Sequence, residues 1–479
     1  MFVEKVPMEK LKYLKLQVPS PTSCYGEDEP LSPAGRLFLH PEMNTIIHFV
    51  IGTENRIDVD TVKAIVQDIF VDKQPRFSSL LVREGGREYW RETQVDIDRH
   101  VVVVNTASAE GDSDRFINDY VAKLSVSVPL GWDKPLWEVH FMPELRCAVF
   151  RIHHALGDGM SLMSLLLGGC QKVNSQSPVV LPPPPMAQSK KHSGGLLRRI
   201  FAALKYALFS FVFCLELLLR SILVGDRRHV ISGGVGGQFL PRKLATARFP
   251  IHDMKIVKNA IPNATINDVL FGVISAGLSK YLDHRRETRL EKGLKMTGVT
   301  MVNLRQLSGQ RELSEMMTKD SKARWGNRFG ILLLPVRCHK KVEDPLDFVV
   351  ESKAMIDAKK RSIEAHFSYA LGNFVMSFFG LKFVFMTYYK TLCHTSFTIS
   401  NMMGPQEKIV IDGNPIKFMR VSSSSLPHSL TMHMLSYAGR AEMQIMAAKD
   451  IVPDPEFLAR CFEDSLHDMK ESALLKVGH

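Results

Sequence analysis

Hydrophobic positions in the first third of the chain follow two spacings, one typical of strands and the other of helices. Short apolar or alternating runs predict strands at 45–51, 77–83, 136–142 and 147–152. A repeat of three to four residues predicts helices at 59–70, 114–124 and 161–167. Alternation of such elements is typical of a mixed α/β (α+β) domain.

The same mixture resumes in the second half of the chain after an interruption. Strands are predicted at 247–251, 298–305 and 331–337, and helices at 267–284, 344–365 and 455–475. Residues 175–195 contain a run of prolines followed by lysines and glycines, which is typical of an exposed crossover. We therefore predict a first lobe over 1–174, a linker over 175–243 and a second lobe over 244–479.

Two long apolar runs stand out from this pattern. The run at 200–225 is long enough to cross a bilayer, which takes about 20 residues. If this run is helical, Lys205, Glu216 and Arg220 fall within an arc of roughly 60°, and the rest of the helix surface is apolar. Three interpretations remain: a membrane span, an interfacial helix or a helix buried in protein. The second run, 374–389, is rich in Phe and Met; a core helix is favoured, with membrane contact or lining of an acyl tunnel as alternatives.

Candidate chemistry is concentrated in the sequence RIHHALGDGM at 151–160. Neighbouring side chains at a strand end point to opposite faces, so His153 and His154 cannot both reach one substrate. Asp158 and Gly159 fall at the start of the next helix, where the carboxylate can cap the first turn or pair with a distant cation. Each residue alone is ordinary, because adjacent histidines are often packed and Asp-Gly is a common turn. A zinc site is less favoured, since the neighbouring sequence offers no third ligand at metal spacing.

In combination these residues form HHxxxDG, which resembles the signature of the coenzyme-A-dependent acyltransferase fold of chloramphenicol acetyltransferase and peptide-synthetase condensation domains. Further motifs resemble the plant form of the wax ester synthase/diacylglycerol acyltransferase family. Each motif is weak evidence by itself, but together, in this order along the chain, they are strong evidence. They are Pro135-Leu136-Trp137, Thr265 to Val269, Val302 to Arg305, Gly326-Asn327-Arg328 and Ser400 to Pro405. One departure is conservative: Met402 replaces the Val that is usual in the last motif.

The resemblance implies a two-lobed, chloramphenicol-acetyltransferase-like fold with a tunnel between the lobes. His154 would lie at the centre of the tunnel and act as the general base, while His153 would orient its loop. Asp158 would point away from substrate and pair with Arg305, which fixes the loop.

Four further residues receive roles by the same resemblance. Gly159 would give the substrate room, and Asn267 would hold the helix that borders the tunnel. Ser400 and Asn401 are candidate contacts to the oxyanion or the substrate. Acyl-CoA would be a co-substrate, with no bound cofactor and no metal.

The implied reaction is the transfer of a long-chain acyl group from acyl-CoA to a long-chain fatty alcohol, with secondary acylation of diacylglycerol. Alternatives are an enzyme acting mainly on diacylglycerol, a non-catalytic membrane lipid-binding protein, and peptide condensation, for which the chain has no carrier domain. The expected location is the endoplasmic reticulum membrane on its cytosolic face, or the plasma membrane.

Composition and charge fit these expectations. The 479 residues are 45% hydrophobic and 23% charged, which is enough for two domains with proper cores. The net charge of +11 suits an anionic membrane surface or the phosphates of coenzyme A. Neither a zinc finger nor a glycine-rich phosphate loop is recognised, so no nucleic-acid partner is expected.

The two-lobe expectation also bears on the apolar run at 200–225. A single span there would put residues 1–195 and 230–479 on opposite sides of a membrane, although the tunnel needs both lobes around one histidine. Glu216 near the middle of a bilayer would also cost on the order of 3 kcal/mol. The sequence therefore predicts a monotopic or re-entrant anchor.

Overall fold

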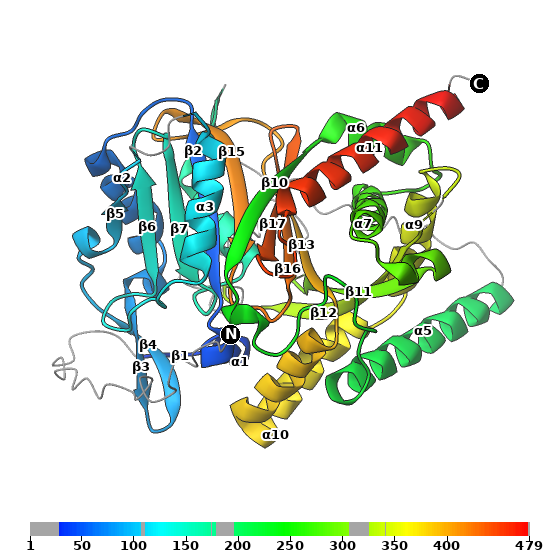
Figure 1. Cartoon of the computed structure of the whole chain (residues 1–479). Helices are drawn as coiled ribbons and strands as arrows, with labels where there is room; N and C mark the ends of the chain where they lie inside the picture. Colours follow the sequence, from blue (N-terminus) through cyan, green and yellow to red (C-terminus); the bar gives the residue numbers. More distant parts are fainter. Residues whose placement is uncertain are drawn as a thin grey trace, which may run out of the picture.

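Two lobes lie side by side in the computed structural model, each built on one large sheet (Figure 1). The structure describes residues 28–106, 111–173, 175–178, 196–305, 325–340 and 342–477. The predicted crossover at 175–195 lies outside the described residues except for the strand β9 (Ser175–Pro178). The domain boundary placed there stays a prediction.

The first lobe is built on an eight-stranded sheet in the order β5-β6-β7-β2-β15-β14-β8-β9. Besides β9, its strands are β5 (Val101–Val103), β6 (Trp137–Met142), β7 (Cys147–His153), β2 (Ile46–Thr53), β15 (Asn414–Ser423), β14 (Ile409–Ile411) and β8 (Cys170–Lys172). Along β7, Phe150 and Ile152 pack into the core that contains the helices α2 (Val59–Val66) and α4 (Gly159–Gly168). Val149, the residue before Phe150, packs with α3 (Ser113–Ser125) on the other face. Burial on both faces explains why β7 reads as a continuous apolar run.

Smaller elements border the first lobe. The helix α1 (Pro33–Leu37) is capped by Ser32, whose hydroxyl accepts a hydrogen bond from the Gly35 amide. A small three-stranded sheet has the order β1-β4-β3, formed by β1 (Glu29–Pro30), β4 (Arg87–Glu92) and β3 (Ser79–Glu84). The predicted helix at 59–70 is split, because α2 continues into a π-helical turn at Gln67–Val71.

The second lobe is built on a six-stranded sheet in the order β10-β17-β16-β13-β11-β12. Its strands are β10 (Arg242–Pro250), β17 (Arg440–Ala448), β16 (Leu430–Tyr437), β13 (Phe397–Met403), β11 (Leu294–Asn303) and β12 (Phe329–Cys338). One face is covered by α6 (Ile251–Asn259), α7 (Ile266–His284), α9 (Asp347–Lys360) and α11 (Pro455–Val477) (Figure 1). Successive residues of β12 pack on opposite faces of this sheet. Leu334 lies in the main core beneath the four helices just named. Leu333 lies in a smaller core on the other face, with α10 (Glu364–Cys393) and α5 (Leu196–Ile222).

Two strands from the second half, β14 and β15, complete the sheet of the first lobe, and the longer one, β15, lies next to the central strand β2. β15 pairs antiparallel with β2, with Ser423 opposite Ile47 and Met419 opposite Ile51. The chain then passes through residues 424–429 and returns to the second lobe as β16. The lobes are therefore joined by an exchanged strand that the sequence did not predict.

The apolar run at 374–389 corrects a sequence-based expectation. It lies in α10, which was expected to be a core helix, yet Phe374, Phe378, Phe379 and Phe383 are between 48% and 72% exposed. Only the opposite side of the helix, including Phe385 and other buried residues, packs on the lobe. The core interpretation fails because the Phe and Met residues surround the whole helix rather than one side of it.

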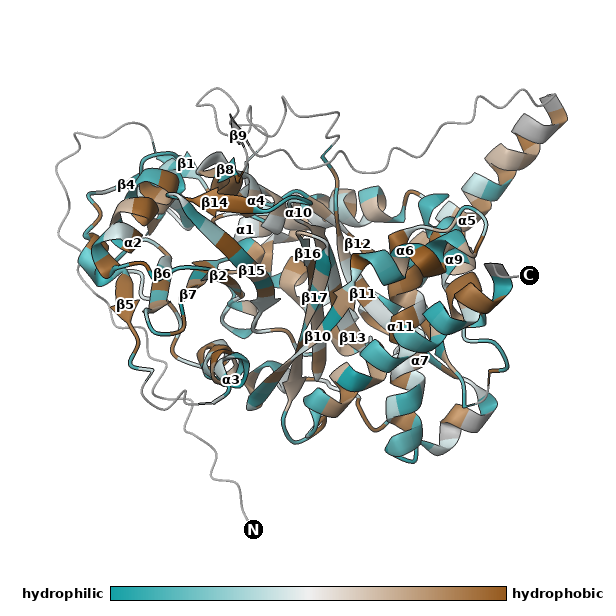
Figure 2. Cartoon of the chain, turned by 90° about the horizontal axis from the view of Figure 1, so that it is seen from above, coloured by the Kyte–Doolittle hydropathy of each residue, from teal (hydrophilic) through white to brown (hydrophobic). Residues whose placement is uncertain are grey.

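The helix α5 lies along α10, with Arg220 and the half-buried Glu216 toward the protein and Lys205 exposed. Arg220 is 6% exposed and donates hydrogen bonds to Glu216 and Asp226, to the Thr297 hydroxyl and to the His394 carbonyl. Residues on the outer side of α5, such as Phe201, Leu204 and Phe211, are about 60–67% exposed. Figure 2 shows one end of α5 reaching beyond the rest of the molecule. The interpretation of 200–225 as a helix buried in protein is therefore wrong.

Loss of the Arg220 charge should detach α5. We expect Arg220→Met to destabilise the protein by about 3 kcal/mol, because it leaves the largely shielded Asp226 carboxylate without its cation and Glu216 with only Lys359, 3.9 Å away. Lys205→Met removes an exposed cation from the same helix and should change stability by less than about 0.5 kcal/mol. Urea unfolding together with limited proteolysis of α5 measures both; equal stability of the two variants would show that the network does not hold the helix.

Candidate active site

The two neighbouring histidines lie where β7 ends and a short loop leads to α4. His153 is the last residue of β7 and pairs with Ile46 at the start of β2. Asp158 is the N-cap of α4, and its carboxylate accepts a hydrogen bond from the Ser161 amide at 3.1 Å. The loop is therefore fixed at both ends by regular secondary structure.

The tautomer of His154 is set by Asn327 in the other lobe. The side-chain amide of Asn327 donates to the His154 carbonyl oxygen at 2.8 Å, so its oxygen must be the atom that faces Nδ1 of the ring, 3.0 Å away. Nδ1 therefore carries the proton, and Nε2 has a lone pair. Within the described residues no protein group hydrogen-bonds to Nε2. This nitrogen is available to accept a proton.

Aromatic rings and burial keep His154 uncharged. The ring of Phe38, which is fully buried, stacks on the imidazole with 4.1 Å between centroids, and Phe329 meets it edge-on at 6.3 Å. Burial lowers the pKa of His154, although Asp158 and Asn327 act in the opposite direction. An imidazole that stays neutral near pH 7 retains the lone pair that a general base needs.

His153 points away from His154 and is held as a structural group. Its Nε2 lies 2.7 Å from Oδ1 of Asn44, and its Nδ1 accepts a hydrogen bond from the Ala155 amide. The side chain is 2% exposed, and burial lowers its pKa to about 3. These contacts link the loop residue Ala155 to Asn44, which precedes β2; the orienting role of His153 stays a prediction.

Asp158 joins the loop to the second lobe. Its Oδ2 accepts from Nη1 of Arg305 at 2.7 Å and from the Arg328 amide at 3.1 Å. The guanidinium of Arg305 also donates to the Gly326 carbonyl and to Asn303. The ion pair predicted from the sequence is therefore present, and its partners extend to the segment 326–328 that carries Asn327.

The remaining predicted residues lie farther along the interface. A Cβ added at Gly159 would come within 3.3 Å of the Met402 sulfur, so α4 begins against β13. Asn267 does not cap α7, because Thr265 and Asp268 form the capping box; instead its exposed side chain accepts from the Asn401 amide at 2.6 Å. The role of Asn267 in holding this helix stays a prediction.

Ser400 lies deeper than Asn401. In the parallel pairing of β13 and β16 it is the register partner of His433, so the two side chains project from the same face of the sheet. Burial, with a contribution from His154, lowers the pKa of His433 to about 4. His433 also lies 3.0 Å from the Ser423 hydroxyl. The contact roles given to Ser400 and Asn401 stay predictions.

Sequence reasoning did not find several residues that surround His154. Asn327 lay in a recognised motif, Gly326-Asn327-Arg328, but without an assigned role. Phe38, Asn44 and His433 gave no signal, because each meets the loop only through tertiary contacts. Trp137 of the Pro-Leu-Trp motif is a core residue. Its side chain is 2% exposed, and its indole N–H donates a hydrogen bond to the Phe77 carbonyl oxygen.

Comparisons with known proteins show the family of the chain. The wax ester synthase/diacylglycerol acyltransferase catalytic domain matches residues 70–270, and the C-terminal domain of the same family matches 325–470. Wax ester synthase/diacylglycerol acyltransferase 11 of Arabidopsis thaliana is 33% identical over 473 residues, covering 94% of this chain and 96% of that protein. The chain belongs to this family. A second family member from Arabidopsis thaliana, number 7, is 33% identical and covers 94% of the chain and 98% of its own length.

Solved structures show the same two-lobed fold beyond the wax ester synthase/diacylglycerol acyltransferase family. The family's enzyme from Marinobacter aquaeolei VT8 superposes with a TM-score of 0.58 at 17% identity, covering 93% of this chain and 99% of that one. Trichothecene 15-O-acetyltransferase from Fusarium sporotrichioides gives a TM-score of 0.55 at 12% identity, covering 93% and 95%. The predicted fold class is thereby confirmed.

Buried neutral histidines predict a stability that falls in acid. His153 and His433 have folded pKa values of about 3 and 4, below the value of about 6.5 in an unfolded chain. The unfolded state therefore binds more protons than the folded state below pH 6.5. The contribution of these histidines to the free energy of unfolding is fully present above pH 6.5 and declines as the pH falls from 6.5 toward 4. Each such group contributes about 1.4 kcal/mol per pH unit within the window.

Urea unfolding between pH 7.5 and 5 tests this dependence. We expect His433→Gln, which keeps a hydrogen-bonding side chain, to reduce the slope by about one proton relative to the native chain. The exposed His252 of α6 provides the control, and His252→Gln should leave the slope unchanged. A native protein equally stable at pH 7.5 and 5 would contradict the assignment of these histidines as neutral.

Proposed function

We propose that this protein is an acyl-CoA-dependent O-acyltransferase that esterifies long-chain fatty alcohols and, secondarily, diacylglycerol. The observation that carries the proposal is the unprotonated Nε2 of His154, held in this tautomer by Asn327 and without a protein partner in the described part of the chain. Membership of the family and the names of the Arabidopsis relatives support the two acceptor classes.

Ester formation needs a base at the acceptor hydroxyl. Nε2 of His154 takes the hydroxyl proton as the alcohol oxygen attacks the carbonyl carbon of the thioester. Asn327 accepts a hydrogen bond from Nδ1–H, which stabilises the imidazolium that forms. The C–S bond then breaks, and the imidazolium returns the proton to the thiolate of coenzyme A. Transfer is direct, so no acyl-enzyme is formed.

The other predicted residues support this base. Asp158 and Arg305 keep the loop and the 326–328 segment together, which maintains the distance between His154 and Asn327. Ser400, on the sheet face that also carries His433, is the better placed of the two candidates for contact with the oxyanion. Asn401 is already engaged with Asn267 at the exposed edge. Gly159 has no side chain and so leaves room for the substrate at the start of α4.

Replacement of the base tests the activity. Purified protein is given radiolabelled acyl-CoA with hexadecanol, with diacylglycerol or with an amine, and products are separated by polarity. We expect ester from hexadecanol, less from diacylglycerol and no amide. His154→Ala should lower kcat by about 10²–10⁴-fold because the proton acceptor is lost. His252→Ala, on the surface of α6, should retain full activity.

The alternatives have distinct outcomes in the same assay. Preference for diacylglycerol would reverse the order of acceptors, and amide formation would indicate condensation chemistry. A native protein that binds lipid without turnover would be a non-catalytic lipid-binding protein. Undiminished turnover by a folded His154→Ala variant would show that another group is the base.

We further propose that the protein docks on a lipid surface through α5 and α10, as a monotopic protein. Together the outer faces of these neighbouring helices expose a band of large apolar residues. The band consists of Phe201, Leu204, Leu208, Phe211, Leu215, Phe374, Phe378, Phe379 and Phe383. An area of this kind is unusual on a protein surrounded by water. Of the polar residues on α5, Arg220 and Glu216 face the protein, so the band itself stays apolar.

Charge and topology favour docking over spanning. Exposed Lys205, Arg227, Lys382 and Lys390 lie on or directly beside the two helices, where they can meet anionic head groups. Arg220 ties α5 to the second lobe, so a crossing would have to carry that lobe with it. We propose the cytosolic face of the endoplasmic reticulum or the plasma membrane as the location.

Charged substitutions within the apolar band should release the protein from membranes. We expect Phe378→Glu combined with Phe379→Glu to reduce sedimentation with phosphatidylcholine/phosphatidylserine vesicles at least tenfold, since two carboxylates would enter the interface. Leu475→Glu, at an equally exposed site on α11, should sediment like the native chain. Equal loss in both variants would mean that binding does not depend on α10.

A further inference from the structure

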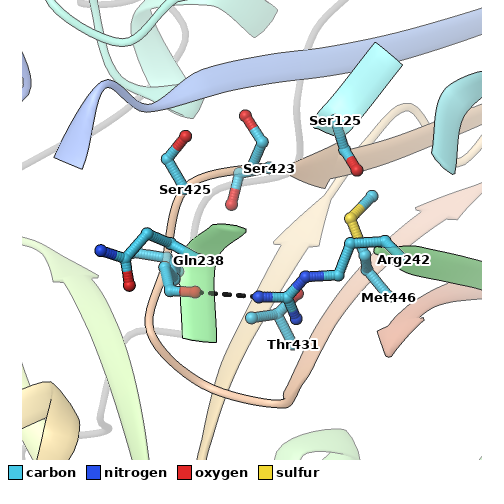
Figure 3. Close-up of a pocket in the computed structure, with 9 residues that line it drawn as sticks. Ser125, Gln238, Arg242, Ser423, Ser425, Thr431 and Met446 are labelled. Carbon is cyan, nitrogen blue, oxygen red and sulfur yellow. Dashed lines mark hydrogen bonds between the residues drawn. The ribbon is translucent and has the colours of Figure 1, made fainter. Parts of the chain in front are cut away.

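A small cavity lies between the lobes, beneath the crossover from β15 to β16 (Figure 3). Its polar lining comes from Arg242, Gln238, Thr431 and the consecutive serines Ser423, Ser424 and Ser425. There is room in it for about one water-sized species. The reaction proposed above uses none of these residues.

The cavity borders a half-buried cation that has no anionic partner among the described residues. Arg242, the first residue of β10, donates to the carbonyl oxygens of His428 at 2.8 Å, Gly237 at 2.6 Å and Leu426 at 3.1 Å. Within the described ranges no carboxylate forms an ion pair with it. Carbonyl dipoles solvate a guanidinium but do not neutralise it, so its positive charge remains in a poorly solvated place. Burial accordingly lowers the pKa of Arg242 to about 10.

Other lining groups have unused hydrogen-bonding capacity. The Thr431 hydroxyl is buried and has no partner, and the same holds for the side-chain nitrogen of Gln238, whose oxygen accepts from the Tyr389 hydroxyl. Thr431 lies beside the guanidinium in Figure 3. Ser425 adopts a left-handed backbone with φ of 64°, which is uncommon for a residue with a side chain. An unsatisfied hydroxyl beside an unpaired cation costs free energy that a ligand would recover.

We propose that this cavity is a binding site for a monatomic anion such as chloride, held by Arg242 and the Thr431 hydroxyl. The size of the cavity excludes phosphate and carboxylate ligands. A neutral water molecule would fill the space but would leave the charge of Arg242 uncompensated, whereas a halide accepts hydrogen bonds and supplies the missing charge.

The anion would strengthen the crossover that joins the lobes. Ser423 contacts His433, and Ser424 exchanges hydrogen bonds with the backbone of Ile46, the register partner of His153. Anion binding at this point therefore stabilises the strand exchange close to the histidine loop. Any species that binds only the folded protein raises its melting temperature, and the rise continues with the logarithm of the ligand concentration once that concentration exceeds Kd.

Thermal unfolding at constant ionic strength tests the site. Sodium chloride replaces sodium gluconate stepwise from zero to 200 mM, and we expect Tm to rise by about 2–4 °C, following the logarithm of the chloride concentration above Kd. The apparent Kd fitted to this curve is taken as the chloride midpoint. Thr431→Val is nearly isosteric and lacks the hydroxyl, so its chloride midpoint should be at least threefold higher. Thr300→Val in β11 of the same sheet, outside the cavity, should respond like the native protein.

Bromide identifies the position independently of stability. Crystals of the native chain grown in sodium bromide should give an anomalous peak beside the Arg242 guanidinium, and crystals of Thr431→Val a weaker peak. Tm values that do not depend on chloride, identical chloride midpoints in all three proteins, or a cavity that holds only water in bromide would overturn the proposal.

Discussion

The buried ion pair between Asp158 and Arg305 is the interaction on which the site depends. Asp158 belongs to the first lobe and accepts from both Arg305 and the backbone of Arg328 in the second. The same 326–328 segment carries Asn327, which orients His154. One carboxylate thus couples the cap of a helix, the contact between lobes and the tautomer of an imidazole. Such a pair contributes little net stability but costs several kcal/mol when one partner is lost, so it fixes geometry more than it adds stability.

Much of the fold was predictable from the sequence because periodicity reports local burial. The strands at 136–142 and 147–152 and the helix at 267–284 were predicted to within two residues of β6, β7 and α7. The strands β13 to β17 were missed, although β14 with β15 and β16 with β17 form local hairpins. The pairing of β15 with β2, by contrast, joins segments far apart in the chain, so a linear pattern could not show this exchange. The amphipathic stripe of α5 was recognised, but the inward orientation of its Arg220 depends on Asp226 and Thr297, which lie elsewhere in the chain.

The site was predictable only where chemistry is encoded in adjacent residues. HHxxxDG identified His154, and the family order of motifs identified Arg305 as the partner of Asp158. Phe38 could not be found, because it reaches the imidazole from α1. That short helix also packs on α10, and His40 beyond it stacks on Phe385 with 3.4 Å between ring centroids. The apolar helices and the histidine loop are therefore separated by only one small element, which brings the proposed lipid-docking surface close to the proposed base.

The exchanged strand has a consequence for how the chain is made. During synthesis, β2 leaves the ribosome long before residues 414–423, so one edge of the first sheet lacks its neighbour until nearly the whole chain has been translated. An unpaired apolar edge invites pairing with other chains. Contacts this far apart in sequence also slow folding. Newly made protein should thus depend on chaperones that shield β2, and truncation after the apolar helices would leave an aggregation-prone fragment instead of an independent first lobe.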